Sequence, residues 1–311
     1  MIVSIGDVMI DAYFQVPDHR NPRTDTHGRV ELAAGGSAAN FAVWVARHGR
    51  MSGLIGCVGD DFLGRGLAAE LEAEGVCPYL TFDPDPECGT GRVGVIVAAN
   101  GERDMICDRR ANTRLSPEDI PEEVVAGAKW LHVSGYAFLE KSPAKAVRRG
   151  IHIAREAGVP VSIDPAAYSF IQALGRQAFL ELCNGATVIL PNLDEGRAMT
   201  GLGRPEDVAA CLLDHFPVVG LKLGGDGCLG MARQWTGMAG MTGAGARAGE
   251  KGPQATVRFA AAPTQVVDTT GAGDAFDAGF VIEYSRGAGL AASLARGNEM
   301  GARAVSKMGA R

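Results

Sequence analysis

The chain has 311 residues, of which 46% are hydrophobic and 21% are charged. That length suits one large α/β domain with an appendage, or two domains, and the apolar share is ample for a core. The net charge of -6 argues against a nucleic-acid-binding protein, and no apolar run approaches the length of a membrane span. The cysteines are odd in number, scattered and without a CxxC pair, which argues against a disulfide framework or zinc site and predicts a cytoplasmic protein.

Short apolar runs alternate with amphipathic segments along the chain. The runs of strand length are 2–5, 54–58, 131–133, 159–163, 188–190 and 218–223. The helical patterns between them are 38–48, 64–74, 142–157 and 204–215. Strands that alternate with helices indicate βαβ units, so we predict the α/β class with a mostly parallel sheet that is covered on both faces.

Two regions, 12–34 and 90–113, interrupt this alternation. The first is polar and contains two prolines, and the second holds two predicted strands around Asn100-Gly101, a strong hairpin signal. We expect these regions to form a small separate sheet that acts as a lid and excludes water from the site. A surface hairpin without function is the alternative.

A first glycine motif opens the helix predicted at 38–48. It reads Gly35-Gly36-Ser37-Ala38-Ala39-Asn40. A glycine backbone can approach a sugar ring closely, and Asn40 can both donate and accept hydrogen bonds to hydroxyl groups. Taken alone, the motif is better explained by a glycine turn with a solvated Asn40.

Two further motifs follow strand-like runs in the second half of the chain. Asn192 and Glu195 are one helical turn apart, which suits a magnesium ion held largely through water, although helix starts are commonly rich in such capping residues. A glycine loop follows Lys222, and it can lie along phosphates or a ribose, or form only a tight turn. Residues 231–256 are rich in Gly and Ala, so we expect an extended, mobile hairpin loop there.

The most informative segment lies at 267–276. It reads Val267-Asp268-Thr269-Thr270-Gly271-Ala272-Gly273-Asp274-Ala275-Phe276. The first N–H groups of a helix lack intrahelical partners and suit an anion, and Asp274 stands at that same end as a candidate base. An anion cradle beside a base indicates phosphoryl transfer to a hydroxyl. An Asp-capped helix after a glycine turn is the alternative.

Together and in this order, the motifs resemble those of the ribokinase-like (PfkB-type) family of sugar and nucleoside kinases. The segment 35–40 looks like the family's N-terminal signature, 268–279 like its C-terminal signature, and 192–195 like its N-x-x-E motif. The likeness spans nearly the whole chain. It implies a doubly wound α/β sheet with a β lid, formed as one domain over residues 1–311, and an ATP-dependent carbohydrate kinase.

The resemblance also implies a role for each motif residue. Asp274 would take the proton from the substrate hydroxyl. Asn192 and Glu195 would organise magnesium and the ATP phosphates. Asp268 would help bind a monovalent cation, as in potassium-activated members. The residues implied in the anion hole are Gly271, Ala272 and Gly273. Those implied at the nucleotide are Asn192, Lys222, Gly224, Gly225, Gly227 and Asn298. Those implied at the sugar are Asp11, Gly35, Gly36 and Asn40.

The acceptor stays open at this point. Ser37 stands where ribokinases usually carry Lys, and Met9 where they carry Asn, which argues against ribose itself. Arg110 lies in a region that resembles the place where 2-keto-3-deoxygluconate kinases hold an arginine, and it would suit an acidic substrate. A nucleoside is the alternative, with stacking candidates Tyr13, Phe14 and Tyr136.

The sequence leaves one rival function open and also predicts the binding partners. A non-catalytic regulator that binds a sugar or nucleotide on the same fold is the rival from a different functional class, although the base and the anion hole are both present in the sequence. The partners we expect are the sugar-like substrate and ATP, with no nucleic acid and no membrane. Since a lid sheet leaves an edge to be paired, we also expect a homodimer through the lid.

Overall fold

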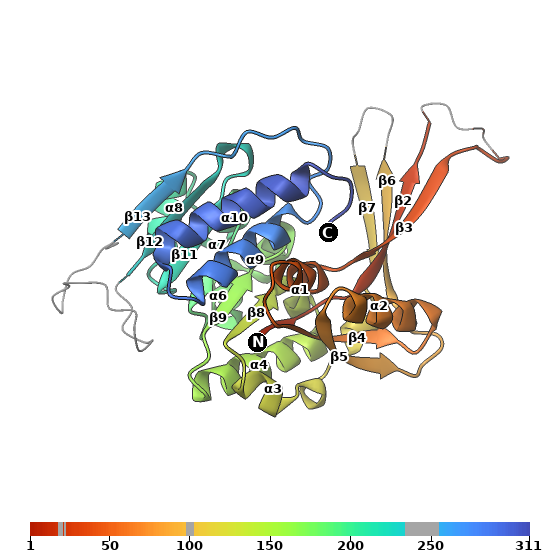
Figure 1. Cartoon of the computed structure of the whole chain (residues 1–311), viewed down its shortest axis with the longest axis horizontal. Helices are drawn as coiled ribbons and strands as arrows, with labels where there is room; N and C mark the ends of the chain where they lie inside the picture. Colours follow the sequence, from red (N-terminus) through yellow and green to blue (C-terminus); the bar gives the residue numbers. More distant parts are fainter. Residues whose placement is uncertain (18–20, 22, 98–102, 234–254) are drawn as a thin grey trace.

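The computed structural model describes residues 1–311 except 18–20, 22, 98–102 and 234–254. A large sheet with helices on both faces forms the main body, and a smaller sheet projects from it (Figure 1). This arrangement confirms the predicted α/β class, with its mostly parallel sheet and its separate β lid.

Nine strands of the described residues form the main sheet, in the order β13-β12-β11-β10-β9-β8-β1-β4-β5. All pairings from β11 to β5 are parallel, and those of β12 with β11 and β13 are antiparallel. The strands are β1 (Ile2–Ile5), β4 (Ser52–Gly59), β5 (Val76–Asp83), β8 (Trp130–Ser134), β9 (Val161–Asp164), β10 (Val188–Ile189), β11 (Val218–Lys222), β12 (Cys228–Ala232) and β13 (Ala255–Phe259). Because β1 is flanked by β4 on one side and β8 on the other, the strand order reverses there, as in doubly wound folds.

Helices cover both faces of this sheet. They are α1 (Ser37–Arg47), α2 (Phe62–Ala73), α3 (Glu122–Ala126), α4 (Lys141–Glu156), α5 (Tyr168–Leu174), α6 (Arg176–Leu182), α7 (Leu193–Thr200), α8 (Pro205–Leu212), α9 (Ala272–Tyr284) and α10 (Gly289–Val305). One core cluster joins α1, α9 and α10 around Phe41 and Phe280, and another joins α4, α7 and α8 around Ile151 and Leu212. Within the described part of the chain, no helix is both long and apolar enough to cross a membrane.

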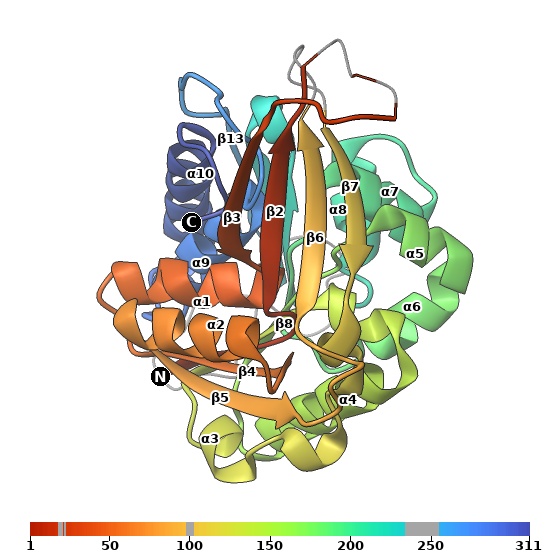
Figure 2. The same ribbon diagram turned by 90° about the vertical axis from the view of Figure 1, so that its right-hand side faces the viewer.

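The lid is a four-stranded sheet with the order β3-β2-β6-β7. Its strands are β2 (Met9–Gln15), β3 (Arg29–Gly35), β6 (Gly91–Val97) and β7 (Arg103–Asp108). Figure 2 views its outer face, which is turned away from the main body. Because β6 and β7 pair antiparallel, the predicted hairpin is present, although its Asn100-Gly101 turn lies outside the described residues.

The lid differs from its predicted limits at two places. It begins at Met9 rather than at residue 12, and residues 110–113 belong instead to a 3-10 helix (Arg110–Arg114). The Asn112 side chain accepts a hydrogen bond from the Val8 N–H at 2.8 Å and donates one to the Val8 carbonyl at 3.0 Å. This buried amide therefore fastens the end of β7 to the chain that leads into the lid.

The sequence patterns did not predict three strands of the main sheet, β5, β12 and β13. The edge strand β5 is mostly half-buried and contains Pro78, so it lacks a continuous apolar run. Strands β12 and β13 pair antiparallel and form the two ends of the segment predicted as a hairpin loop. The loop between them, at 234–254, lies outside the described residues.

Candidate active site

A cleft of about 680 Å³ runs between the lid and the main body. It is lined by lid residues of β2, β6 and β7 and by main-body residues that follow the strands or begin α1 and α9. Most residues proposed from the sequence line it. They are Asp11, Gly36, Asn40, Asn192, Glu195, Lys222, Gly224, Gly225, Gly227, Gly271, Ala272, Gly273, Asp274 and Asn298.

The start of α9 presents its backbone to this cleft. Gly271 is the N-cap residue with a φ of 72°, and no side chain caps the helix there. A Cβ at Gly271 would lie 2.5 Å from the Ala310 carbonyl oxygen, so both the backbone angle and the space require glycine. Asp274 therefore does not cap the helix, which overturns the alternative of an Asp-capped turn. No side chain occupies the first N–H groups, and the Ala272 N–H donates to the Thr269 carbonyl at 3.3 Å, a long hydrogen bond that an anion can replace.

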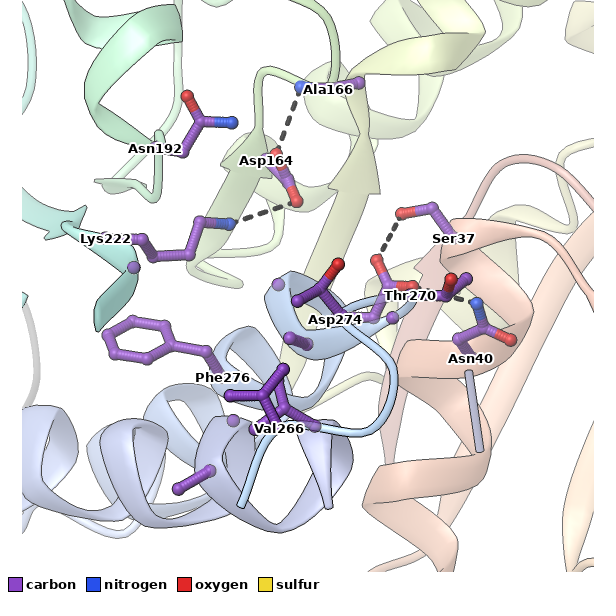
Figure 3. Close-up of a pocket in the computed structure, with 18 of the residues that line it drawn as sticks. Ser37, Asn40, Asp164, Ala166, Asn192, Lys222, Val266, Thr270, Asp274 and Phe276 are labelled. Carbon is purple, nitrogen blue, oxygen red and sulfur yellow. Dashed lines mark hydrogen bonds and ion pairs between the residues drawn. The ribbon is translucent and has the colours of Figure 1, made fainter. Parts of the chain in front are cut away.

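The Asp274 carboxylate is held by the first turn of α1 (Figure 3). Its Oδ1 accepts a hydrogen bond from Ser37 Oγ at 2.7 Å, and its Oδ2 accepts one from Asn40 Nδ2 at 2.9 Å. Burial raises the pKa of Asp274 to about 7, while the hydrogen bonds from Asn40 and Ser37 oppose this rise. A carboxylate with a pKa near neutrality can accept a proton at physiological pH.

Tight backbone contacts bring the first glycine motif to this position. Gly36 has a φ of 95°, and a Cβ there would lie 2.3 Å from the Asp7 carbonyl oxygen. A Cβ at Gly35 would lie 2.4 Å from the Asp11 carboxylate, so Gly35 supports Asp11 without lining the cleft itself. Burial raises the pKa of Asp11 to about 6. The motif therefore places Asp11, Asn40 and Asp274 around one end of the cleft.

A buried ammonium lies beside the anion hole. Lys222 Nζ is 3.2 Å from Asp164 Oδ2 and 3.1 Å from Asp277 Oδ1, and it would lie 3.5 Å from a Cβ at Gly273. Burial lowers the pKa of Lys222, but the two carboxylates outweigh burial and raise it, so the side chain is charged. Lys222 and Asp164 line the cleft, while Asp277 is fully buried. The buried charges are thus paired, as their desolvation requires.

Asn192 and Glu195 form a capping box at the start of α7. Asn192 Oδ1 accepts from the Glu195 N–H at 2.9 Å, and Glu195 Oε2 accepts from the Asn192 N–H at 2.8 Å. Both side chains also line the cleft. Burial and the nearby charge of Asp164 raise the pKa of Glu195 to about 8. A divalent cation would relieve this concentration of negative charge, so the residues present fit a magnesium ion.

Besides Gly35, two other proposed residues, Asp268 and Arg110, lie away from the cleft lining. The buried Asp268 carboxylate accepts from the Thr270 N–H at 2.8 Å and from the Gly309 N–H at 2.9 Å, so it joins the anion-hole loop to the C-terminal segment. Arg110 pairs with Asp108 at 2.7 Å and donates to the Cys88 carbonyl at 2.7 Å. The 3-10 helix after β7 turns Arg110 outward, so the structure places no Arg110 guanidinium in the cleft.

Sequence reasoning missed several residues of this site. Ser37 was read only as a departure from a family pattern, although it donates to the base. Asp277 stands one helical turn after Asp274, and Asp164 ends a strand run, but neither position alone indicates a partner for Lys222. Of the three aromatic candidates, only Tyr136 lines the cleft; Tyr13 is buried in the lid, and Phe14 is partly exposed on its outer face.

Comparison with known proteins agrees with this geometry. A family model described as pfkB family carbohydrate kinase matches residues 1–311. The chain belongs to this family. Among curated relatives of this pfkB carbohydrate kinase, the aminoimidazole riboside kinase of Salmonella typhimurium is 30% identical over 98% of this chain and 89% of its own length. Fructokinase-1 of Oryza sativa subsp. japonica is 29% identical over 89% of this chain and 80% of its own.

A solved structure shows the same fold. A protein from E. coli described as a Ribokinase II, in complex with ATP and Mg²⁺, superposes with a TM-score of 0.80, at 24% identity, over 99% of this chain and 94% of its own. The curated relatives of the pfkB carbohydrate kinase include both a riboside kinase and a fructokinase, so kinship alone does not name its acceptor.

Proposed function

We propose that this kinase transfers the γ-phosphoryl group of ATP to a hydroxyl group of a sugar or sugar-derived acceptor. The observation that carries the proposal is the uncapped start of α9 with the Asp274 carboxylate beside it, held by Ser37 and Asn40. An anion site and a base within one helical turn are the two groups that an attacking alcohol and a transferring phosphoryl group require.

In this reaction the acceptor oxygen bonds to the γ-phosphorus, and the bond from that phosphorus to the β,γ-bridging oxygen breaks. The acceptor proton passes to Asp274, and ADP leaves with the bonding electron pair. The N–H groups of Gly271, Ala272 and Gly273 stabilise the charge that develops on the transferred group. The protein thus acts mainly by positioning and by electrostatic stabilisation.

The other end of the cleft would receive the nucleotide. The Lys222 ammonium lies beside the anion hole, where it would face the ATP phosphates, and the glycine loop Gly224–Asp226 lies next to it along the chain. Asn298 donates to the Ala260 carbonyl at 2.7 Å and lines the cleft at the adenine side that we propose. Glu195 and Asn192 would hold magnesium, which neutralises phosphate charge when it is bound.

A monovalent cation such as potassium is a further proposal for this enzyme. The Asp268 carboxylate is buried between the anion-hole loop and Gly309, so a cation there would order the N–H groups of that loop. Turnover in potassium compared with tetramethylammonium at equal ionic strength measures this effect. Equal rates in both salts would remove the cation from the proposal.

The outer face of the lid fits a second copy of this chain. Strand alternation places Phe14, Val30, Leu32 and Ile106 on that face, and all four are exposed. An exposed apolar sheet face is typical of an interaction surface. We therefore propose a homodimer that buries the outer faces of two lids. Separately, the seven free cysteines support the proposal of a cytoplasmic enzyme, because thiols stay reduced in that compartment.

The function is tested with Asp274→Asn, an isosteric change that removes the base. ADP release is measured with ATP, magnesium and a panel of sugars, keto-acids and nucleosides, and ATP binding is measured by calorimetry. We expect turnover to fall about 10³-fold or more while ATP still binds. Asp194→Asn, which alters an exposed surface ion pair, is the matched control. Near-normal turnover in Asp274→Asn would remove Asp274 as the base, and tight binding without turnover in the parent would favour a regulator.

A further inference from the structure

The part of the lid's inner face that lines the cleft carries one charged residue, Asp11, among apolar side chains. Strand register aligns Asp11 with Val93 and Val93 with Cys107, and it aligns Tyr13 with Val95 and Val95 with Met105. Val93, Val95, Met105 and Cys107 all line the cleft, as does Met9 at the base of the lid. On its lid side, the acceptor end of the cleft is therefore bounded by the Asp11 carboxylate and a broad hydrophobic surface.

No unpaired cation lines this cleft among the described residues. The ammonium of Lys222 is held between Asp164 and Asp277, and Arg110 pairs with Asp108 outside the cleft. Arg109 pairs with Asp7 at 2.7 Å, and Arg311, whose charge opposes the rise in the pKa of Asp11, donates to the Ala34 carbonyl; neither arginine lines the cleft. Asp11 and Asp274 also bring negative charge to the acceptor end. An acceptor with a carboxylate or a phosphate would meet repulsion there without a compensating partner.

The polar groups gather on the main-body side of the acceptor end. Asn40 Nδ2 donates a hydrogen bond to Asp274, whereas the buried Asn40 Oδ1 has no hydrogen-bond partner within the described protein. A buried amide oxygen without a partner is costly, so it calls for a donor from the ligand. A hydroxyl group next to the one that Asp274 deprotonates would supply that donor, and Asp11 would accept from another.

These features describe an amphipathic, uncharged acceptor. The two lid rows, Val93 with Cys107 and Val95 with Met105, lie roughly 7 Å apart along the strands, so together they offer an apolar surface about as long as one ring. A free hexose would turn hydroxyl groups toward Val93, Val95 and Met105, where they would lose their hydrogen bonds to water and gain no partner. A flat base attached to a pentose would bury its apolar face there.

From this arrangement we infer that the acceptor is a neutral nucleoside, whose sugar hydroxyls contact Asp11 and Asn40 and whose base lies against Val93, Val95, Met105 and Cys107 of the lid. The inference rests on the proposed phosphotransfer and deepens it, because it names the acceptor class of the same cleft.

The first test compares acceptors with the parent enzyme. ADP release is measured with ATP and magnesium against neutral nucleosides (adenosine, inosine and cytidine), free ribose and fructose, and the anionic 2-keto-3-deoxygluconate. Binding of each acceptor is measured by calorimetry in parallel. We expect at least one nucleoside to exceed every free sugar and the anionic acceptor by 100-fold or more in kcat/KM, and to bind more tightly.

The second test alters one lid residue on each face of the same strand. Met105→Gln adds a polar group on the inner face, and Ile106→Gln makes a similar change on the outer face at the neighbouring position. Both residues are well exposed, at 56% and 66%, so neither change threatens folding. We expect Met105→Gln to raise the KM for the nucleoside about tenfold and to leave the KM for free ribose nearly unchanged. Ile106→Gln should change neither KM.

The outcomes separate the inference from the function on which it rests. Selective nucleoside binding without any turnover keeps the acceptor class and overturns the phosphotransfer. Turnover that is highest with fructose, ribose or the anionic acceptor keeps the phosphotransfer and overturns the nucleoside. Failure of every nucleoside to bind, or an equal effect of Met105→Gln and Ile106→Gln on the nucleoside KM, also overturns it.

Discussion

The start of α9 and the lid differ in how their side chains are held. Around α9, Asp274 and Asp277 are buried and Lys222 is only slightly exposed, and each pairs with a residue on another element. The lid is a single sheet whose inner face lines the cleft and whose outer face carries exposed apolar residues. We therefore expect substitutions around α9 to impair the reaction itself, and substitutions in the lid to alter the proposed choice of acceptor or the proposed dimer.

The largest effect is expected from Lys222→Met. The change leaves Asp164 and Asp277 buried without their cation, so we expect a stability loss of about 3–5 kcal/mol and a loss of turnover of about 100-fold or more. Thermal unfolding and ADP release measure the two effects. The double variant Lys222→Met/Asp277→Asn should recover part of the melting temperature but not the turnover. Recovery of both together would show that Lys222 has only a structural role.

Gly271→Ala tests the anion hole itself. The new Cβ would meet the Ala310 backbone at a φ of 72°, so the first N–H groups of α9 must shift. We expect kcat to fall about 100-fold while the KM for the acceptor changes little. Gly289→Ala is the matched control, since its φ is 79° and nothing lies within 4 Å of its Cβ position. Equal losses in the two variants would point to backbone strain alone.

The pH dependence tests the environment of the base. Because only deprotonated Asp274 can accept the proton, kcat/KM should fall as pH drops below about 7. Ser37→Ala removes a hydrogen bond that favours the charged form, so the pKa rises and the acid limb moves up by about one pH unit. Ser285→Ala, at the other end of α9, should leave the profile unchanged. A limb that stays in place in Ser37→Ala contradicts this account.

The smallest effect on activity is expected at the outer face of the lid. Leu32→Glu places a charge on the proposed dimer surface, so light scattering should detect monomers while turnover stays within about twofold. Phe62→Glu, on the exposed surface of α2, is the control and should keep the dimer. A parent protein that is already monomeric, or a Leu32→Glu variant that stays dimeric, would exclude this face as the interface.

Much of the fold followed from local patterns. The alternation of apolar runs with amphipathic segments predicted the mostly parallel sheet, and Asn100-Gly101 with its flanking strands predicted the lid hairpin. The edge strand β5 was missed because its half-buried residues form no continuous apolar run. The limits of the lid were misjudged because Asn112 turns the chain back to the main body through contacts with Val8, far away in sequence.

What the sequence determined by itself was the set of reactive groups: a glycine-rich helix start with Asp274, a second glycine motif with Asn40, and Asn192 with Glu195. Backbone angles and the positions where helices begin depend mainly on residues that are adjacent in the sequence, so short motifs predict them. Only the tertiary structure decided how these groups meet. The Ser37–Asp274 hydrogen bond joins residues 237 positions apart, and the charge of Lys222 depends on Asp164 and Asp277 from two other elements. Arg110 lies outside the cleft for a different reason: it begins the 3-10 helix after β7, where it pairs with Asp108 and donates to the Cys88 carbonyl. Burial and pairing are properties of the folded chain.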